Sequence, residues 1–310
     1  MSSNQPKPVV LVTGADLAPQ AIGILSDFNL VYAGARPTED DLIRLVKEHD
    51  PIALIVRYGR ITPAIIDAAR SLKVISKHGS GVDTIDQTAA KARGIQVCAA
   101  AGANAAAVAE HAIALMLGCA KSLVSLDQRM HAGHWDKSTH KSLELEGRTL
   151  GLVGLGAIGQ RVAAIAHAMG MQIVGFDPFA KNLPAYIHTA SLDEIWQQSD
   201  VISLHCPLTD ENRNLIDASV LSKCKDGVVI VNTARGGLIN EPDLVQALRS
   251  GKVRAAGIDS FSQEPPPADH VFFNEPGLLL SPHIGGVTSD AYVKMGCGAA
   301  QNILSALETK

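Results

Sequence analysis

Short apolar runs alternate with longer segments of mixed polar and apolar residues along most of the chain, and the pattern occurs twice. Alternating strands and helices of this kind predict βαβ units on a parallel sheet. Before residue 100 the strand-like runs are Val9–Thr13, Ile52–Val56, Val74–Ser76 and Ile95–Cys98, and the helix-like runs are Glu39–Lys47, Pro63–Ala69 and Asp86–Arg93. We expect a small α/β domain here.

The pattern restarts at Leu150. The second series of expected strands is Leu150–Val153, Gln172–Phe176, Val201–Leu204, Val228–Asn232, Ala255–Ile258 and Leu278–Leu280. Proline-rich Ser262–His270 is expected as a loop, and Thr288–Leu307 as a final helix. Ala103–Leu126 reads as one long helix that continues through Leu123–His140 into a connecting arm. The predicted fold class is α/β, with two doubly wound parallel-sheet domains.

A glycine-rich turn follows the strand Leu150–Val153. Gly154, Gly156 and Gly159 have the G-x-G-x-x-G spacing, and Asp177 ends the next strand, 18 residues after the third glycine. The glycines allow a tight turn, close backbone approach to a pyrophosphate and close helix packing, while the acid can bind ribose hydroxyls. Such a triplet alone also occurs in purely structural turns, but the strand, helix and distal acid together indicate a dinucleotide site.

Composition narrows the functional classes. A chain of 310 residues predicts about two domains, and a net charge of −4 without a cationic run argues against nucleic acid as a partner. The five cysteines include no C-x-x-C pair, which argues against disulfides or structural zinc and favours a reducing cytoplasm. Residues 1–8 lack an apolar signal core, and no segment is expected to span a membrane.

Four reactive side chains follow the later strands, where ligands of open parallel sheets bind. They are Arg235, Asp259, Glu264 and His283. A guanidinium can hold a carboxylate, a histidine exchanges protons near neutral pH, and a paired carboxylate favours its protonated form. Singly, each is more often a surface or turn residue; together they can polarise and protonate a keto acid carbonyl.

Six motifs in this order resemble the D-isomer-specific 2-hydroxyacid dehydrogenases, and within them the phosphoglycerate dehydrogenases. They occupy residues 77–86, 152–160, 205–209, 232–239, 257–265 and 281–286. The resemblance implies interconversion of a D-2-hydroxy acid and its 2-keto acid by hydride transfer, with 3-phosphoglycerate or another acidic hydroxy acid as the leading substrate class.

The resemblance also implies roles for individual residues. Arg235 would bind the substrate carboxylate and the reacting oxygen, His283 would be the general acid or base, and Glu264 would pair with His283. Backbone N–H groups of Ser80, Gly81 and Val82 would bind the substrate carboxylate.

The implied cofactor is NAD rather than NADP, since Asp177 would repel a 2′-phosphate. Asp259 would hold the nicotinamide amide. No metal is expected. The expected cofactor-binding residues are Gly154, Gly156, Ala157, Ile158, Gly159, Asp177, His205, Cys206, Pro207, Thr209, Thr233, Ala234, Asp259, His283 and Gly285.

The family pattern further implies a discontinuous substrate-binding domain, residues 1–101 and 286–310, and a Rossmann-type NAD-binding domain, residues 102–285. The first domain is expected to be flavodoxin-like. Relatives form homodimers, for which Trp135 would be an anchor, although packing on its own core is an equal alternative. No C-terminal regulatory domain is expected after Lys310.

The chain departs from the pattern after its third expected strand, where many phosphoglycerate dehydrogenases have Arg-Ser-x-Thr. Here the residues are Arg57-Tyr58-Gly59-Arg60-Ile61-Thr62. Arg57 is expected to bind substrate, with Arg60 either helping to hold an acidic group or lying on the surface, and Tyr58 could crowd a large group. The substrate therefore stays open. The alternative function is an NAD(H)-sensing, corepressor-like protein without turnover.

Overall fold

The computed structural model describes residues 6–308, which form two compact units. Unit 1 comprises the chain up to Asn104 and from Val287 onward, and unit 2 comprises Ala105–Gly286. The boundaries expected from the sequence were residues 101/102 and 285/286. Residues 1–5 and 309–310, which belong to the expected first domain, lie outside the described residues.

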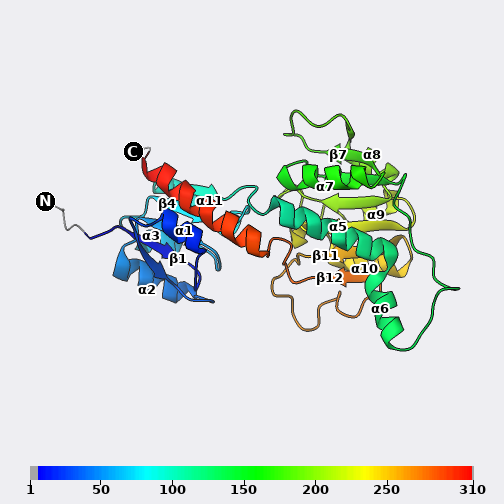
Figure 1. The fold of residues 1–310 in the computed structure, drawn as a ribbon, viewed down its shortest axis with the longest axis horizontal. Coiled ribbons are helices and arrows are strands. Elements are labelled where there is room, and N and C mark those ends of the chain that lie inside the picture. The colour runs from blue at the N-terminus through cyan, green and yellow to red at the C-terminus, as the bar shows by residue number, and fades with distance from the viewer. Residues whose placement is uncertain (1–5, 309–310) are drawn as a thin grey trace. The chain divides into compact units, whose positions relative to one another are not determined.

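Unit 1 is a five-stranded parallel sheet with the order β2-β1-β3-β4-β5 and helices on both faces. This is the flavodoxin-like order. Helices α2, α3 and α4 cover one face, while α1 and the returning α11 cover the other, where they lie side by side (Figure 1). The strands are β1 (Val9–Val12), β2 (Asn29–Tyr32), β3 (Ala53–Val56), β4 (Val74–Lys77) and β5 (Gln96–Ala99); the helices are α1 (Pro19–Ile24), α2 (Glu39–His49), α3 (Pro63–Ala68), α4 (Gln87–Ala92) and α11 (Ser289–Glu308).

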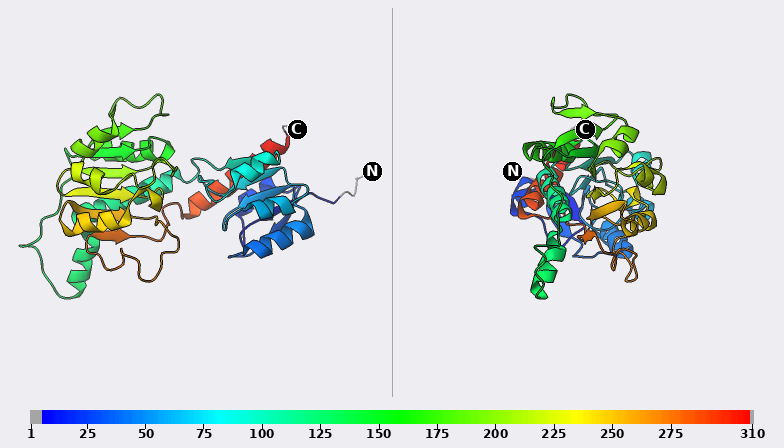
Figure 2. Two further views of the ribbon diagram at one scale, coloured as in Figure 1. Left: turned by 180° about the vertical axis from the view of Figure 1, so that it is seen from behind. Right: turned by 90° about the vertical axis from the view of Figure 1, so that its right-hand side faces the viewer.

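Unit 2 is a seven-stranded parallel sheet with the order β12-β11-β10-β9-β6-β7-β8. Helices α5 and α7 cover one face and α8, α9 and α10 the other, seen from behind in Figure 2. The strands are β6 (Thr149–Val153), β7 (Gln172–Phe176), β8 (Ile187–Thr189), β9 (Val201–Leu204), β10 (Val228–Asn232), β11 (Val253–Ile258) and β12 (Leu278–Leu280); the helices are α5 (Ala105–Lys121), α6 (Leu123–His131), α7 (Ala157–Ala168), α8 (Leu192–Gln198), α9 (Ala218–Lys223) and α10 (Glu241–Arg249). The predicted fold class is confirmed.

Local signals explain where several helices begin and end. Thr62 caps α3 by accepting a hydrogen bond from the backbone N–H of Ile65, and Pro63 stands at the first helical position. After α4, Gly94 has a positive φ of 65°, which ends the helix. The predicted final helix is confirmed as α11.

The expectation of one long helix over Ala103–Leu126 is wrong. Helix α5 ends at Lys121, Ser122 adopts a left-handed conformation with φ 54°, and α6 continues at an angle of 59°. Gly133, with φ 84°, follows the end of α6, so the arm after it is not helical. Helix α1 and strands β2 and β8 were not predicted.

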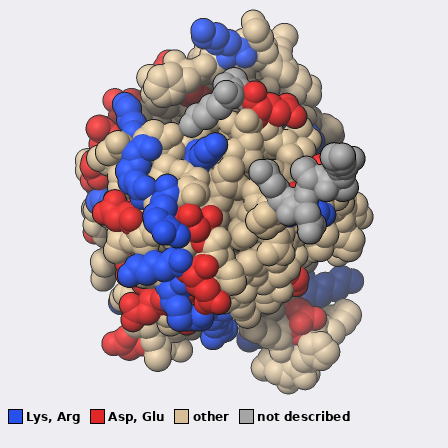
Figure 3. Space-filling model, turned by 90° about the vertical axis from the view of Figure 1, so that its left-hand side faces the viewer, with Lys and Arg blue, Asp and Glu red and all other residues tan. Residues whose placement is uncertain are grey.

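The surface carries both signs of charge. On the face shown in Figure 3, Lys and Arg side chains lie next to Asp and Glu. Among the described helices, none is long and apolar enough by itself to cross a membrane; α5 and α6 meet that criterion of length and composition only as a bent pair.

Candidate functional site

The glycine-rich turn lies where the unit 2 sheet reverses its winding direction. Strand β6 pairs with β7 on one side and with β9 on the other, so the loops after β6 and β9 flank the crevice in which ligands bind. Gly154 has φ 98°, and a Cβ added there would lie 2.7 Å from the backbone of His205 and Cys206. A Cβ on Gly159 would lie 2.1 Å from the Gly154 oxygen. Both glycines are therefore required by close approach of the backbone.

Asp177 fixes this turn from the end of β7. Its two carboxylate oxygens accept hydrogen bonds from the backbone N–H groups of Leu155 and Phe179, each at 2.8 Å. Gln160 on α7 donates to the Leu155 oxygen at 2.8 Å. Asp177, which was expected to bind ribose, therefore stabilises the backbone of the glycine-rich turn.

The loop after β9 is held by a residue that the sequence analysis did not single out. The Asn212 amide donates to the Pro207 oxygen and accepts from the Thr209 backbone N–H, both at 2.7 Å. Two buried polar atoms near the strand ends, His205 Nδ1 and Thr233 Oγ1, have no hydrogen-bond partner among the described residues. Burial lowers the pKa of His205 to about 4, so its imidazole is neutral at pH 7. These atoms are suited to a polar ligand.

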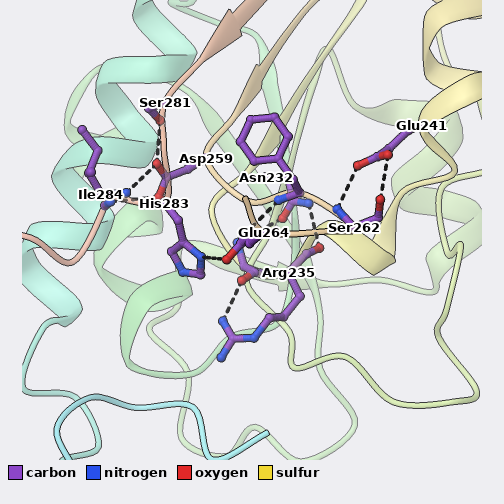
Figure 4. Close-up of polar contacts among 12 residues, drawn as sticks. Asn232, Arg235, Glu241, Asp259, Ser262, Glu264, Ser281, His283 and Ile284 are labelled. Carbon is purple, nitrogen blue, oxygen red and sulfur yellow. Dashed lines mark hydrogen bonds and ion pairs between the residues drawn. The ribbon is translucent and has the colours of Figure 1, made fainter. Parts of the chain in front are cut away.

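His283 and Glu264 form the central pair of the site. His283 Nδ1 and Glu264 Oε2 are 2.7 Å apart (Figure 4). The hydrogen bond to Glu264 raises the pKa of His283, against the opposing effect of burial. Burial alone would raise the pKa of Glu264, but the hydrogen bond and charge of His283 outweigh it, so that this pKa is lowered. The pair therefore favours an imidazolium beside a carboxylate, with Nε2 left to exchange a proton.

The backbone of His283 is strained and is held by a buried acid. Its φ is 53°, a left-handed conformation that non-glycine residues rarely adopt. Asp259, at the end of β11 and 1% exposed, accepts hydrogen bonds from the backbone N–H groups of Ile284 and Gly285 at 2.9 and 2.8 Å. Ser281 Oγ donates to Asp259 Oδ1 at 2.6 Å. These bonds fix the loop that presents the imidazole.

Arg235 is presented by a turn after β10. Asn232, fully buried, donates through its amide to the Arg235 oxygen at 2.9 Å and accepts from the Ala234 N–H at 3.0 Å. The guanidinium Nη1 donates to the Ala234 oxygen at 2.7 Å. Figure 4 shows that Arg235 and the His283–Glu264 pair come together from different loops at one edge of the sheet.

A second buried acid holds the loop that carries Glu264. Glu241, at the start of α10, accepts hydrogen bonds from the backbone N–H and the hydroxyl of Ser262 at 2.9 and 2.8 Å, and lies 3.0 Å from His270 Nε2. The Phe261 N–H donates to Glu264 Oε1 at 3.1 Å. The carboxylate partner of His283 is thus positioned from two sides.

The expected substrate residues Arg57, Ser80, Gly81 and Val82 belong to unit 1. The last three form an irregular turn after β4. Among the described residues, no backbone carbonyl accepts a hydrogen bond from their N–H groups, while Ser80 Oγ donates to Asn104 Oδ1 at 2.8 Å. Arg57 follows β3 and is largely buried.

Comparison with known sequences identifies the family. Residues 113–285 match the family described as D-isomer specific 2-hydroxyacid dehydrogenase, NAD binding domain. The chain belongs to this family. Its similarity to a hydroxypyruvate reductase from Thermotoga maritima is 41% identity over 273 residues, 87% of this chain and 88% of that protein.

Other members of the D-2-hydroxyacid dehydrogenase family are similar over nearly the whole chain. A D-3-phosphoglycerate dehydrogenase from Mycobacterium tuberculosis is 38% identical over 97% of this chain, which spans 57% of that longer protein. The crystal structure of a glyoxylate reductase from Paecilomyes thermophila superposes with a TM-score of 0.88 at 34% identity, covering 98% of this chain and 96% of the other.

The unit 2 crevice fits the NAD that this family binds. Gly156 precedes α7, and a Cβ there would meet nothing within 4 Å, so space is open before the first N–H groups of a helix of 12 residues. Thr233 Oγ1 and His205 Nδ1 supply polar atoms that the described protein leaves unpartnered. No group of three or more metal-binding side chains occurs among residues 6–308.

Several supporting residues could not be recognised from the sequence. His111 on α5 lies 2.8 Å from Ser281 Oγ, although 170 residues separate the two in the chain. Asn232 and Ser281 lie inside the family motifs of residues 232–239 and 281–286. Apart from that, nothing in the sequence indicates that they support the site. Glu241 offered only the weak signal of an acid in the first turn of a helix, and its burial became apparent only in the structure.

Proposed function

We propose that this dehydrogenase interconverts a D-2-hydroxy acid and its 2-keto acid with NAD, through His283, Glu264 and Arg235. The observation that carries the proposal is the 2.7 Å contact between His283 and Glu264 beside Arg235 at the carboxyl edge of the unit 2 sheet. A proton-exchanging group and a carboxylate-binding group at one place are what a 2-keto acid requires.

The roles follow from the charges. NAD, when bound, supplies the hydride acceptor in oxidation, and NADH supplies the donor in reduction. In reduction, protonated His283 gives its Nε2 proton to the carbonyl oxygen. In oxidation, neutral His283 takes the hydroxyl proton. Arg235 holds the substrate carboxylate, and Glu264 stabilises the imidazolium.

We assign the cofactor to unit 2 and, as a separate proposal, carboxylate binding to the turn of residues 80–82 in unit 1. The glycine turn, Asp177 and the orphaned Thr233 hydroxyl support the first assignment. The turn of residues 80–82 supports the second, because N–H groups without backbone acceptors suit a carboxylate. Relatives named for hydroxypyruvate, 3-phosphoglycerate and glyoxylate define the substrates to test.

The proposed function is tested by loss of NADH absorbance with purified protein and a panel of 2-keto acids that includes hydroxypyruvate, phosphohydroxypyruvate and glyoxylate. Saturable turnover with at least one acid supports the proposal. Tight NADH binding without turnover of any acid would contradict it and favour a cofactor-sensing protein.

Glu264→Gln is expected to shift the pH dependence of the reaction. Because the hydrogen bond to Glu264 raises the pKa of His283, losing the carboxylate charge lowers that pKa. The reduction rate, which needs imidazolium, then declines at lower pH than in wild type, and oxidation sets in at lower pH. The measurement is kcat/KM against pH in both directions. Identical pH profiles in wild type and variant would show that Glu264 does not raise the pKa of His283 during the reaction.

We also propose a homodimer formed through α6 and the arm after it. Trp135 is 74% exposed, so it is not packed on its own core, and Leu123, Val124 and Met130 are also exposed. Trp135 borders a hollow of about 250 Å³, and the Arg129–Asp136 ion pair braces the arm. A rigid exposed tryptophan suits an interface anchor.

Trp135→Ala is expected to weaken dimerisation at least about thirtyfold, as loss of an interface anchor typically does. Sedimentation velocity over a concentration series gives the dissociation constant. Phe179→Ala, which removes an aromatic ring that is 86% exposed on another loop, serves as the control and should leave it unchanged. A monomeric wild-type protein would rule out the dimer.

We further propose a cytoplasmic location. Its support is the set of cysteines, all of which are free thiols: Cys98, Cys119, Cys206, Cys224 and Cys297. Free thiols without disulfides are typical of a reducing compartment.

A further inference from the structure

One buried carboxylate in unit 2 holds both ends of the loop that carries Glu264. The Glu241 side chain, 10% exposed, stands at the start of α10. Its Oε1 accepts a hydrogen bond from the backbone N–H of Ser262 at 2.9 Å, and its Oε2 accepts one from the Ser262 hydroxyl at 2.8 Å. The same Oε2 lies 3.0 Å from His270 Nε2. Since Ser262 precedes Glu264 and His270 follows it, a single side chain closes the loop.

Aromatic rings enclose the contact between Glu241 and His270. The His270 side chain is 7% exposed, and its ring centre lies 5.7 Å from that of Phe261 and 5.0 Å from that of Phe272, with an edge-on geometry in both pairs. The backbone N–H of Phe272 donates to His270 Nδ1 at 3.3 Å, which leaves the Nε2 proton for Glu241. Because the rings exclude water, this hydrogen bond to a carboxylate is stronger than it would be at the surface.

The closed loop reaches Glu264 through one backbone group. Ser262 adjoins Phe261, whose N–H donates to Glu264 Oε1 at 3.1 Å. Glu264 Oε2 in turn contacts His283 Nδ1 at 2.7 Å, as Figure 4 shows. A Cβ added to Gly236 would lie 1.9 Å from the Phe261 carbonyl carbon, so the turn after β10 packs directly on this segment. A displacement of Ser262 would therefore move the carboxylate that His283 contacts.

We propose that Glu241 is a positioning residue for the reaction: by closing the loop, it holds the Glu264 carboxylate against His283. The inference rests on the proposed function, in which this pair exchanges the proton. Three donors converge on the Glu241 carboxylate, and they need an acceptor with two oxygens. An amide has one oxygen, so its NH₂ group would face a donor and open the loop at one end.

The other charges that face His283 are held independently of Glu241. The hydrogen bond to Glu264 has the largest effect on the pKa of His283, while the charge of Arg235 lowers this pKa and that of Asp259 raises it. Arg235 is bonded to its own turn, and Asp259 is bonded to the loop that carries His283. A change at position 241 is therefore expected to reach His283 through Glu264.

The test is Glu241→Gln, measured by NMR titration of His283 in protein with isotope-labelled histidine. The His283 signal is assigned by its absence from His283→Gln. Because the hydrogen bond to Glu264 raises the pKa of His283, loosening it is expected to lower that pKa. In steady-state kinetics, kcat for reduction is expected to fall roughly tenfold to 10²-fold at unchanged NADH affinity, and the rate to decline at lower pH than in wild type.

A double variant separates positioning from a general loosening of the fold. In the Glu264→Gln background, Glu241→Gln is expected to leave the titration of His283 unchanged, because the carboxylate through which it acts is gone. The matched control is Glu194→Gln. Glu194 lies in the first turn of α8, which packs on β6 and β7, and it likewise accepts hydrogen bonds from the N–H and the hydroxyl of a serine, Ser191. This variant should titrate like wild type.

Ser262→Ala tests the same step if Glu241→Gln fails to fold. It removes one hydroxyl donor and no charge, and it should shift the pKa of His283 in the same direction. Because the NMR titration needs no turnover, inactivity with every keto acid would overturn the proposed function, while the titration would still decide the role of Glu241. A His283 titration equal to that of wild type, or a shift that persists in the Glu264→Gln background, overturns the positioning role.

Discussion

His283→Gln is expected to lower kcat for keto-acid reduction by about 10²- to 10⁴-fold, the usual contribution of a general acid. Glutamine can keep a hydrogen bond to Glu264 but cannot deliver a proton. The loss should appear at every pH, because no titrating group replaces the imidazole. The change of rate with pH that reflects protonation of His283 should also be absent in the variant. Steady-state kinetics with the best keto acid give kcat and KM, and fluorescence titration gives the NADH affinity.

The matched control is His188→Gln on the edge strand β8, where the imidazole is exposed and outside the site. It should behave like wild type. If His283→Gln retained more than about a tenth of wild-type kcat, proton transfer by His283 would be excluded, because general acid catalysis is worth far more. Loss of NADH affinity of the same size as the loss of kcat would instead indicate a collapsed cofactor site.

The parts of the site that follow strands could be predicted from the sequence. Glu264, His283 and Arg235 were inferred from the rule that ligands bind at the carboxyl ends of parallel strands, and the structure places all three at that edge. The glycine turn is equally local, since its residues and the helix after it are contiguous. A functional residue can be predicted from the sequence when its position is set by the strand that directly precedes it.

The missed parts depend on contacts between distant segments. Tyr292 reaches Asp16 across 276 positions because α11 returns to the sheet that β1 began, and His111 reaches Ser281 across 170. No periodicity in the sequence encodes such a contact. The ion pair between Arg57 and Asp16 could therefore not be recognised from the sequence.

The missed strands have a different cause. Strands β2 and β8 lie at the edges of their sheets, and each is only partly buried. Strand β8 has a single apolar residue, Ile187, and so lacks the apolar run that marks a central strand, whereas β2 contains Leu30, Val31 and Tyr32 and was overlooked in spite of such a run. Ser122 breaks the α5–α6 segment through its backbone conformation, for which a serine between helix-forming residues gives little warning.

Arg235→Lys is expected to reduce kcat/KM by roughly tenfold to 10²-fold, because the paired hydrogen bonds of the guanidinium to a carboxylate are lost while the positive charge stays. Lysine keeps the positive charge but presents a single ammonium instead of the planar fork that binds both oxygens of a carboxylate. Most of the loss should lie in KM, because the carboxylate is present in both ground and transition states. Any decrease in kcat beyond the change in KM would measure the contribution of Arg235 to polarising the reacting oxygen.

Arg249→Lys provides the control, because Arg249 ends α10 and pairs with Glu275 away from the strand ends. Near-wild-type kinetics in that variant would show that the effect at position 235 is local. The two roles of Arg235 separate further with Arg235→Ala and added guanidinium: rescue of kcat without rescue of KM would assign the guanidinium to the reacting oxygen. Wild-type KM in Arg235→Lys would remove Arg235 from the carboxylate site.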